Sequence, residues 1–223
     1  MLKMVVFDLD DTLYLERNYS RSGFNAVGNQ VLSEWNRDDF ADIAWELFQH
    51  GERGNIFDLA LQRSGVNANK QQIAALVELF RNHSPEIDLE VDAINCLRHI
   101  PSHITTGLIT DGYKTGQRLK IHALSLENSV DHIIITDKYG REFWKPHPFA
   151  FKRLESAAQT EGKNCVYIGD NPKKDFTAPN ARGWTTIRIK RPLSLHVELP
   201  SPTYIDAEIS ELSKLWPLLD TLS

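Results

Sequence analysis

The sequence predicts an α/β protein in which a Rossmann-like parallel sheet, with helices on both faces, carries a small all-helical cap domain. Short, continuous apolar runs alternate along the chain with longer segments whose apolar residues recur at helical spacing. This alternation is typical of a parallel sheet whose strands are connected by helices. A simple crossover needs only about a dozen residues. Because far more chain separates the first two predicted strands, we expect a domain inserted between them.

Five segments are predicted to be strands, because they are short, rich in Val, Ile or Thr, and end in turn residues. These segments are residues 4–9, 104–110, 132–136, 165–169 and 185–190. The last one alternates Thr186 and Arg188 with Ile187, which predicts an edge strand. The closing segment, residues 212–223, predicts a helix with Pro217 near its start or at a kink.

The insert has apolar stripes of its own, spaced as on amphipathic helices. The stripes are Phe24, Val27, Val31 and Trp35; Phe40, Ile43, Ala44, Leu47 and Phe48; and Ile73, Leu76, Val77 and Phe80. Segments rich in Gly and Asn, HGERGN and SGVNANK, separate these predicted helices. We therefore assign residues 16–87 to a helical cap domain over the strand ends, and residues 1–15 and 88–223 to the core.

The composition excludes several classes of protein. The chain has 30 acidic and 25 basic residues and a formal charge of −5, which argues against a nucleic-acid partner. No apolar run approaches the roughly 18 residues of a membrane span, and the first residues lack a signal-peptide pattern. We therefore expect a cytoplasmic protein without a membrane partner, and the sequence gives no indication of its oligomeric state. Cys96 and Cys165 have no second Cys or His at ligand spacing, which predicts buried free thiols.

Four polar clusters each follow a predicted strand. They are DLDDT at 8–12, TDG at 110–112, KPHP at 145–148, which a predicted hairpin separates from its strand, and GDNPKKD at 169–175. The carboxyl ends of parallel strands meet at one edge of the sheet, where such proteins bind ligands. We therefore expect the four clusters to form one site.

The acids of these clusters suit a divalent cation. Asp8 and Asp10 lie two residues apart at the end of a strand and can converge with Asp170 on one point. Carboxylate oxygens are hard ligands, and Mg²⁺ takes few protein ligands while it keeps water and phosphate oxygens. We therefore predict Asp8, Asp10 and Asp170 as ligands of Mg²⁺.

The same edge carries groups that complement a phosphoryl group. Lys145 is an ammonium point charge, Thr110 offers a hydroxyl, and the backbone amides of Asp111 and Gly112 lie at a strand-to-helix turn. Donors of this kind bind a dianionic phosphate. We therefore predict Thr110, Asp111 and Lys145 as phosphate-binding residues.

The order of the four clusters, with a helical insert between the first and the second, resembles the haloacid dehalogenase superfamily of phosphohydrolases. The resemblance covers essentially the whole chain. It implies that Asp8 is the nucleophile and that Asp10 is the general acid and base. It further implies that Thr110 holds the transferring phosphoryl group, that Lys145 steadies the nucleophile, and that Asp170 binds Mg²⁺. In this family the main-chain carbonyl at the position of Asp10, rather than the carboxylate, is the usual metal ligand.

Other residues match the family less directly. Asp175 resembles a second acid, which orients a metal-bound water or Lys145. The insert resembles the family's cap, which closes over the site and shapes the choice of substrate. Arg17 and Arg53 are candidates for binding a carboxylate or a second phosphate of the substrate. His147 is a third candidate for a substrate contact.

These features predict a magnesium-dependent phosphatase that acts through an aspartyl phosphate. The expected substrate is a small phosphorylated metabolite, such as a sugar phosphate, a nucleoside monophosphate or a phosphorylated hydroxy acid. A phosphomutase of the same superfamily stays open, as does a phosphoryl-accepting, receiver-like signalling module. Dehalogenases that resemble this fold lack the second aspartate, so Asp10 and Asp170 argue against that chemistry. The sequence gives no role for residues 191–204.

Overall fold

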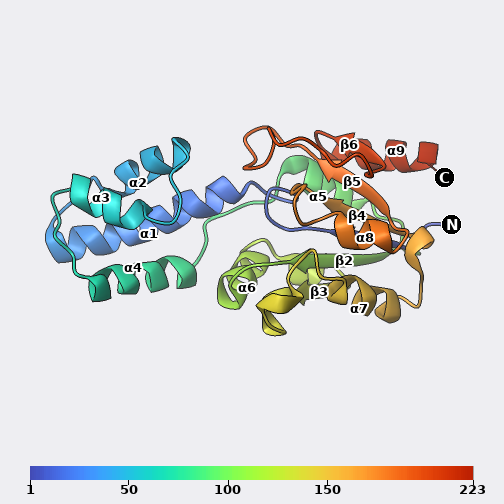
Figure 1. Ribbon diagram of the computed structural model, residues 1–223, viewed down its shortest axis with the longest axis horizontal. Coiled ribbons are helices and arrows are strands. Elements are labelled where there is room, and N and C mark those ends of the chain that lie inside the picture. The colour runs from blue at the N-terminus through green and yellow to red at the C-terminus, as the bar shows by residue number, and fades with distance from the viewer. Residues whose placement is uncertain (223) are drawn as a thin grey trace. The chain divides into compact units, whose positions relative to one another are not determined.

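The computed structural model describes residues 1–222 and contains a sheet with the strand order β3-β2-β1-β4-β5-β6 (Figure 1). The strands are β1 (Met4–Phe7), β2 (Thr105–Thr110), β3 (His132–Ile135), β4 (Cys165–Gly169), β5 (Thr185–Ile189) and β6 (Ala207–Ile209). All neighbouring strands run parallel. The predicted α/β fold with a parallel sheet is therefore confirmed.

The strand order reverses at β1. The sheet first grows from β1 to β3 on one side, and the chain then returns to add β4, β5 and β6 on the other. In sheets of this kind, a crevice forms at the carboxyl ends of the strands where the order reverses. The DLDDT, TDG and GDNPKKD clusters follow β1, β2 and β4, which are the three adjacent strands at this point.

Helices connect the strands. The α-helices are α1 (Glu16–Trp35), α2 (Phe40–Gln49), α3 (Ile56–Arg63), α4 (Lys70–Asn82), α5 (Val91–Arg98), α6 (Lys114–Ala123), α7 (Phe149–Ala157), α8 (Thr177–Ala181) and α9 (Leu215–Leu222). Short 3-10 helices cover Leu126–Asn128, Thr136–Lys138, Arg141–Phe143, Gly162–Asn164 and Leu212–Lys214. The hairpin predicted after β3 is wrong, because two of these 3-10 helices occupy that part of the chain. The predicted C-terminal helix is present with Pro217 in the first turn of α9, and its last predicted residue, Ser223, lies outside the described residues.

Both faces of the sheet are buried. Met4 and Val6 of β1 and Tyr167 of β4 pack against residues of α7 and α8. Val5 and Phe7 point to the opposite face because side chains alternate along a strand, and they are fully buried as well. Strands that are covered on both faces have continuous apolar sequences, which is why the sequence predicted them.

The prediction that β5 is an edge strand is wrong. β6 pairs with β5 in parallel, with Ile187 opposite Ala207. Thr186 and Arg188, whose polarity suggested an exposed edge, are both fully buried. These side chains face hydrogen-bond partners further along the chain instead of water. For Thr186 the partner is the Asp206 carboxylate, which lies 3.0 Å from Thr186 Oγ1.

Arg188 holds the 191–204 segment. Its guanidinium donates hydrogen bonds to the carbonyls of His196 (2.7 Å) and Leu199 (2.8 Å) and to Ser201 Oγ (2.6 Å). Its Nε donates to the carbonyl of Asp170 (3.1 Å). A single buried side chain therefore ties this irregular segment to the GDNPKKD cluster.

Two further contacts attach the same segment to the DLDDT cluster. Arg191 Nε donates to the carbonyl of Thr12 (2.8 Å), and the backbone N–H of Leu195 donates to Asp11 Oδ2 (2.7 Å). Arg191 also forms an ion pair with Asp92 at 2.9 Å. The 191–204 segment, whose role could not be predicted from the sequence, thus contacts two of the four polar clusters.

The chain divides into two compact units, one formed by Met1–Glu16 with Asp88–Ser223 and the other by Arg17–Ile87. Within the first unit, the backbone N–H of Glu90 donates to the carbonyl of Leu13 (3.0 Å). The chain that leaves toward the insert is therefore hydrogen-bonded to the chain that returns from it.

The Arg17–Ile87 unit is helical and has an aromatic interior. Its helix α4 begins with a capping box, in which the side chains of Asn69 and Gln72 bond to each other's backbone N–H groups. Gly23 of α1 lies so close to Phe80 of α4 that a Cβ atom there would stand 2.3 Å from the ring. Only glycine allows this approach of the two helices.

Cys96 and Cys165 are buried free thiols, as predicted. Among residues 1–222, no helix combines the length and apolar character that crossing a membrane requires.

Candidate active site

Three buried acids gather where β1 and β4 end. Asp8 follows β1, Asp170 and Asp175 follow β4, and one carboxylate oxygen of each lies within 4.8 Å of the others. The two strands are paired, and the backbone N–H of Asp8 continues the ladder by donating to the carbonyl of Ile168 (2.8 Å). The sheet itself therefore brings these residues, the acid cluster, to one point.

Lys145 supplies the positive charge beside the acid cluster. Its Nζ lies 2.6 Å from Asp8 Oδ1 and 2.8 Å from Asp175 Oδ1, and it donates a hydrogen bond to the Tyr167 hydroxyl (2.9 Å). Burial lowers the pKa of Lys145, but attraction to Asp175 and Asp8 outweighs it and raises the pKa well above its usual value. The ammonium therefore stays charged although its side chain is fully buried.

If all its carboxyl groups were ionised, the acid cluster would carry more negative charge than one ammonium can balance. Burial raises the pKa of Asp8 to about 7, against the opposing attraction of Lys145. Burial and the charges of Asp175 and Asp8 raise the pKa of Asp170 to about 10. Asp170 Oδ2 is also buried without a hydrogen-bond partner among the described residues. Hard oxygen ligands, excess negative charge and an unpartnered carboxylate oxygen fit a divalent cation such as Mg²⁺.

The Asp10 carboxylate is not a member of the acid cluster, whose third member is Asp175. Lys120 Nζ lies 2.7 Å from Asp10 Oδ1, Gln117 Nε2 lies 2.8 Å from Oδ2, and the Tyr14 hydroxyl also donates to Oδ1. Burial acts to raise the pKa of Asp10, but attraction to Lys120 and these hydrogen bonds lower it below its usual value. Three donors thus hold the Asp10 carboxylate, and they favour its ionised form over its protonated form.

Asp111 joins three of the polar clusters. Its carboxylate accepts hydrogen bonds from Thr136 Oγ1 (2.7 Å), from the backbone N–H of Lys145 (3.2 Å) and from Lys174 Nζ (3.1 Å). Burial opposes ionisation, but Lys145 and Lys174 lower the pKa of Asp111 below its usual value. The Asp111 side chain therefore fixes the TDG, KPHP and GDNPKKD clusters to one another. Thr110, directly before it, accepts a hydrogen bond on Oγ1 from Gln117 Nε2.

Asp11 shapes the turn that follows β1. It adopts a positive φ of 54°, and its carboxylate accepts hydrogen bonds from the backbone N–H groups of Glu16 (2.9 Å) and Leu195 (2.7 Å). Burial raises the pKa of Asp11 to about 6 and that of Glu16 to about 7. Asp11 therefore connects the turn after β1 with the start of α1 and with the 191–204 segment.

A family model described as haloacid dehalogenase-like hydrolase matches residues 2–181. The chain belongs to this family. This chain is 27% identical to the glyceraldehyde 3-phosphate phosphatase of Pyrococcus furiosus, in an alignment that covers 98% of this chain and 93% of the relative. It is 23% identical to the pyrimidine 5'-nucleotidase YjjG of Escherichia coli, over 95% of this chain and 96% of that enzyme.

A solved structure shares the fold of the hydrolase. The 2-haloacid dehalogenase from Pseudomonas syringae aligns with a TM-score of 0.66 and 21% identity over 100% of both chains. At this identity the likeness concerns the fold alone. Together with the phosphatase relatives, the family model confirms the predicted superfamily and the prediction of an enzyme that hydrolyses phosphoric monoesters.

The three predicted substrate contacts of the hydrolase all have local partners. Arg17 lies over the Trp45 ring at 5.1 Å, and Arg53 lies over the Phe48 ring at 4.1 Å. Arg53 Nη1 also donates to the carbonyl of Phe48 (2.9 Å). His147 is exposed, and its Nδ1 accepts a hydrogen bond from the backbone N–H of Phe149.

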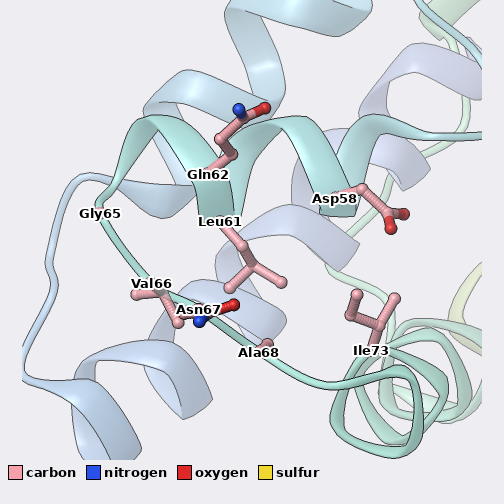
Figure 2. A pocket seen from close by; sticks show the side chains of 8 residues that line it. All are labelled: Asp58, Leu61, Gln62, Gly65, Val66, Asn67, Ala68 and Ile73. Carbon is pink, nitrogen blue, oxygen red and sulfur yellow. The ribbon is translucent and has the colours of Figure 1, made fainter.

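The Arg17–Ile87 unit contains a cavity of about 490 Å³ (Figure 2). Its walls are Asp58, Leu61, Gln62, Gly65, Val66, Asn67, Ala68 and Ile73. These residues come from α3, from the loop that follows it and from α4, so none of the predicted substrate contacts lines the cavity.

Sequence reasoning missed four residues of the site, which are Tyr14, Gln117, Lys120 and Lys174. Gln117 and Lys120 lie three residues apart on α6, just after the TDG cluster, and this spacing places them on one helix face. Lys174 stands directly before Asp175 inside a cluster that the sequence had already singled out. The helical spacing of Gln117 and Lys120 and the position of Lys174 can both be seen in the sequence. Neither feature indicates which acid Lys120 or Lys174 would contact.

Proposed function

We propose that this hydrolase is a magnesium-dependent phosphatase of small phosphorylated metabolites, which works through an aspartyl phosphate on Asp8. The observation that carries the proposal is the buried Asp8 carboxylate, 2.6 Å from the Lys145 ammonium and clustered with Asp170 and Asp175. An ionised carboxylate is a suitable nucleophile toward phosphorus, and the Lys145 ammonium favours the ionised form of Asp8 against the effect of burial. The active site must lower the activation barrier considerably, since catalysis of phosphate-monoester hydrolysis requires a barrier reduction on the order of 20 kcal/mol.

In the first step, an oxygen of Asp8 attacks phosphorus while the bond to the leaving oxygen breaks. The leaving oxygen takes the electron pair of that bond and a proton from Asp10, which must be protonated at this stage to act as general acid. Lys145 holds the attacking carboxylate in place, and the Thr110 hydroxyl lies at the end of β2, where the phosphoryl group would bind.

In the second step, water attacks the aspartyl phosphate and gives a proton to Asp10, while the bond between phosphorus and Asp8 breaks. The ionised form of Asp10, which Lys120 favours, is the form that this step requires. When bound, Mg²⁺ would neutralise charge on the phosphoryl oxygens and on Asp8. Asp8, Asp170 and Asp175, with the main-chain carbonyl of Asp10, are the groups that would hold it.

The names of the relatives support a small substrate, because one is a phosphatase of glyceraldehyde 3-phosphate and another is a nucleotidase. We propose that residues 16–87 form the cap that excludes bulk water from the bound metabolite. Arg17, Arg53 and His147 stay our candidates for contacts to its leaving group. A cytoplasmic location stays a prediction.

The test is phosphate release from a panel of sugar phosphates, nucleoside monophosphates and phosphorylated hydroxy acids, with and without EDTA. Wild type is compared with Asp8→Asn, and Asp38→Asn on the exposed surface serves as the matched control. We expect release from some substrates by wild type and by the control, and none after Asp8→Asn or after chelation.

Two other outcomes separate the alternatives. Isomerised phosphate esters without free phosphate would indicate a phosphomutase. A stable aspartyl phosphate that forms without turnover would indicate phosphoryl acceptance rather than hydrolysis. Release that survives Asp8→Asn would refute the nucleophile that we propose.

A further inference from the structure

The helix α6 presents two buried polar side chains to the proposed general acid. Gln117 is 3% exposed and Lys120 is 4% exposed, and their spacing of three residues places both on one face of the helix. An ammonium is almost never buried unless it is paired, because the loss of its hydration is costly. Lys120 has its partner in Asp10, whose Oδ1 lies 2.7 Å from Lys120 Nζ.

The Asp10 carboxylate is held from two directions. From α6, Lys120 donates to Oδ1 and Gln117 donates to Oδ2 at 2.8 Å. From its own loop, the Tyr14 hydroxyl donates to Oδ1, and an isolated β-bridge connects Asp10 with Tyr14. Because both oxygens have donors and the donors come from separate parts of the chain, rotation of the carboxylate would break several hydrogen bonds at once.

Gln117 also connects Asp10 with the proposed phosphate site. Its Nε2 donates to Thr110 Oγ1 as well as to Asp10. The turn between them leaves room for this side chain, since Gly112 has a φ of 118° and a Cβ atom there would stand 3.3 Å from Gln117 Cδ. The Gln117 amide therefore fixes the Thr110 hydroxyl, which we place at the phosphate site, relative to Asp10, the proposed general acid.

We infer that Gln117 and Lys120 are positioning residues, which hold Asp10 in the orientation that delivers its proton to the leaving oxygen of the substrate. This inference rests on the proposed function and deepens it. It assigns the two residues to one part of the reaction, the cleavage of the bond between phosphorus and a poor leaving group. An alkoxide needs a proton as it leaves, whereas p-nitrophenolate is stable enough to leave without one.

The experiment compares two probes, p-nitrophenyl phosphate and the alkyl phosphate of the panel that wild type hydrolyses fastest. The variants are Lys120→Met, Gln117→Leu and the conservative Lys120→Arg. Lys114→Met, an exposed lysine of the same helix, is the matched control. The parameter is kcat/KM, because it reports the steps up to the first irreversible one, which is the transfer of the phosphoryl group to Asp8.

We expect Lys120→Met and Gln117→Leu to lower kcat/KM for the alkyl phosphate by at least about tenfold. For p-nitrophenyl phosphate the fall should stay within about threefold, so the ratio between the two probes changes. Lys120→Arg should restore most of the loss, and Lys114→Met should match wild type on both probes.

Several outcomes would overturn the inference. An equal fall on both probes would mean that the residues only support the fold, and a melting curve for each variant identifies such cases. An unchanged or increased rate on the alkyl phosphate would mean that Lys120 does not position Asp10 for catalysis. If Lys120→Met does not fold, the ratio of kcat/KM on the two probes for Gln117→Leu tests the inference in its place. These failures are distinct from failure of the proposed function, in which wild type itself releases no phosphate or Asp8→Asn keeps full activity.

Discussion

Lys145 Nζ lies 2.6 Å from Asp8 Oδ1, and the two side chains are 0% and 5% exposed. At this distance and burial, the ammonium is the main influence that lowers the pKa of the nucleophile, although burial outweighs it and raises that pKa to about 7. The same ammonium contacts Asp175, so one lysine from the KPHP cluster serves acids from two different strand ends.

Replacement of Lys145 should abolish activity and weaken the fold. Lys145→Met leaves the acid cluster without its counterion, and breaking a buried ion pair in this way costs about 3–5 kcal/mol of unfolding free energy. We expect kcat to fall by about 10²-fold or more, since an electrostatic stabiliser of the reaction is lost. Urea unfolding and phosphate release measure the two effects, with Lys152→Met on the exposed face of α7 as control. Activity within threefold of wild type would rule out the role of Lys145.

The acid cluster predicts which variants lose Mg²⁺. Asp170→Asn and Asp175→Asn should weaken Mg²⁺ binding by at least about tenfold, whereas Asp10→Asn should change it by less than about threefold. The reason is that the Asp10 carboxylate is engaged by Lys120 and Gln117, while its main-chain carbonyl is unaltered by the substitution. Isothermal titration calorimetry measures the affinities. A loss in Asp10→Asn as large as that in Asp170→Asn would favour the carboxylate ligand set expected from the sequence.

Without Mg²⁺, stability should fall as the pH rises from 5 to 9. Asp8 and Asp170 have pKa values of about 7 and about 10 in the folded state, against an ordinary value of 3.8. In that range the unfolded chain has already lost the protons that the folded chain still keeps on these two carboxyls, so each rise in pH favours unfolding. The slope is at most about 1.4 kcal/mol per pH unit for each group.

Above about pH 8, Asp170 is the main carboxyl that still titrates in the folded state, because the raised pKa values of Asp8, Asp11 and Glu16 lie at or below about 7. Cys96 and Cys165, whose pKa values burial raises to about 12, add a dependence of the same sign near pH 9. Asp170→Asn should therefore flatten the profile between pH 7 and 9, and saturating Mg²⁺ should flatten it in wild type. Urea midpoints in EDTA at pH 5, 7 and 9 provide the measurement. A stability that rises over this interval in EDTA would contradict the electrostatics described here.

Replacement of the buried Arg188 should cause a large loss of unfolding free energy. Arg188→Met leaves its acceptors in the 191–204 segment and at Asp170 without a donor, which predicts a loss of roughly 3 kcal/mol or more. Hydrogen exchange within residues 191–204 should become faster. Arg98→Met, at an exposed position of α5, should stay within about 0.5 kcal/mol of wild type. Unchanged exchange in the 191–204 segment would show that other contacts hold it.

The parallel fold and the meeting of Asp8 with Asp170 could be predicted because short-range signals determined them. Continuous apolar runs identified β1 and β4, and the acids stand directly behind these strands. Parallel topology then brings Asp8 and Asp170 together without any information on side-chain packing. The third side chain of the acid cluster is Asp175, whereas the ligand set expected from the sequence had the Asp10 carboxylate in that place.

The partners of Asp10 and of Arg188 could not be predicted in the same way. Gln117 and Lys120 are 107 and 110 residues away from Asp10 in the sequence, so their contact depends on how α6 packs against the loop after β1. Arg188 looked like an exposed residue because its alternation with isoleucine is the pattern of a half-buried strand. The carbonyls that it binds belong to an irregular segment, whose sequence has no periodicity to indicate its path.

The hydrogen bond between Leu13 and Glu90 closes the core at the base of the insert. From the viewpoint of evolution, the Arg17–Ile87 unit inserted between these two residues is an interchangeable module, because its length and sequence can vary at the thermodynamic cost of a surface loop. If residues 16–87 are the cap, a lineage can then acquire a new metabolite by remodelling this module while it inherits the phosphoryl chemistry unchanged.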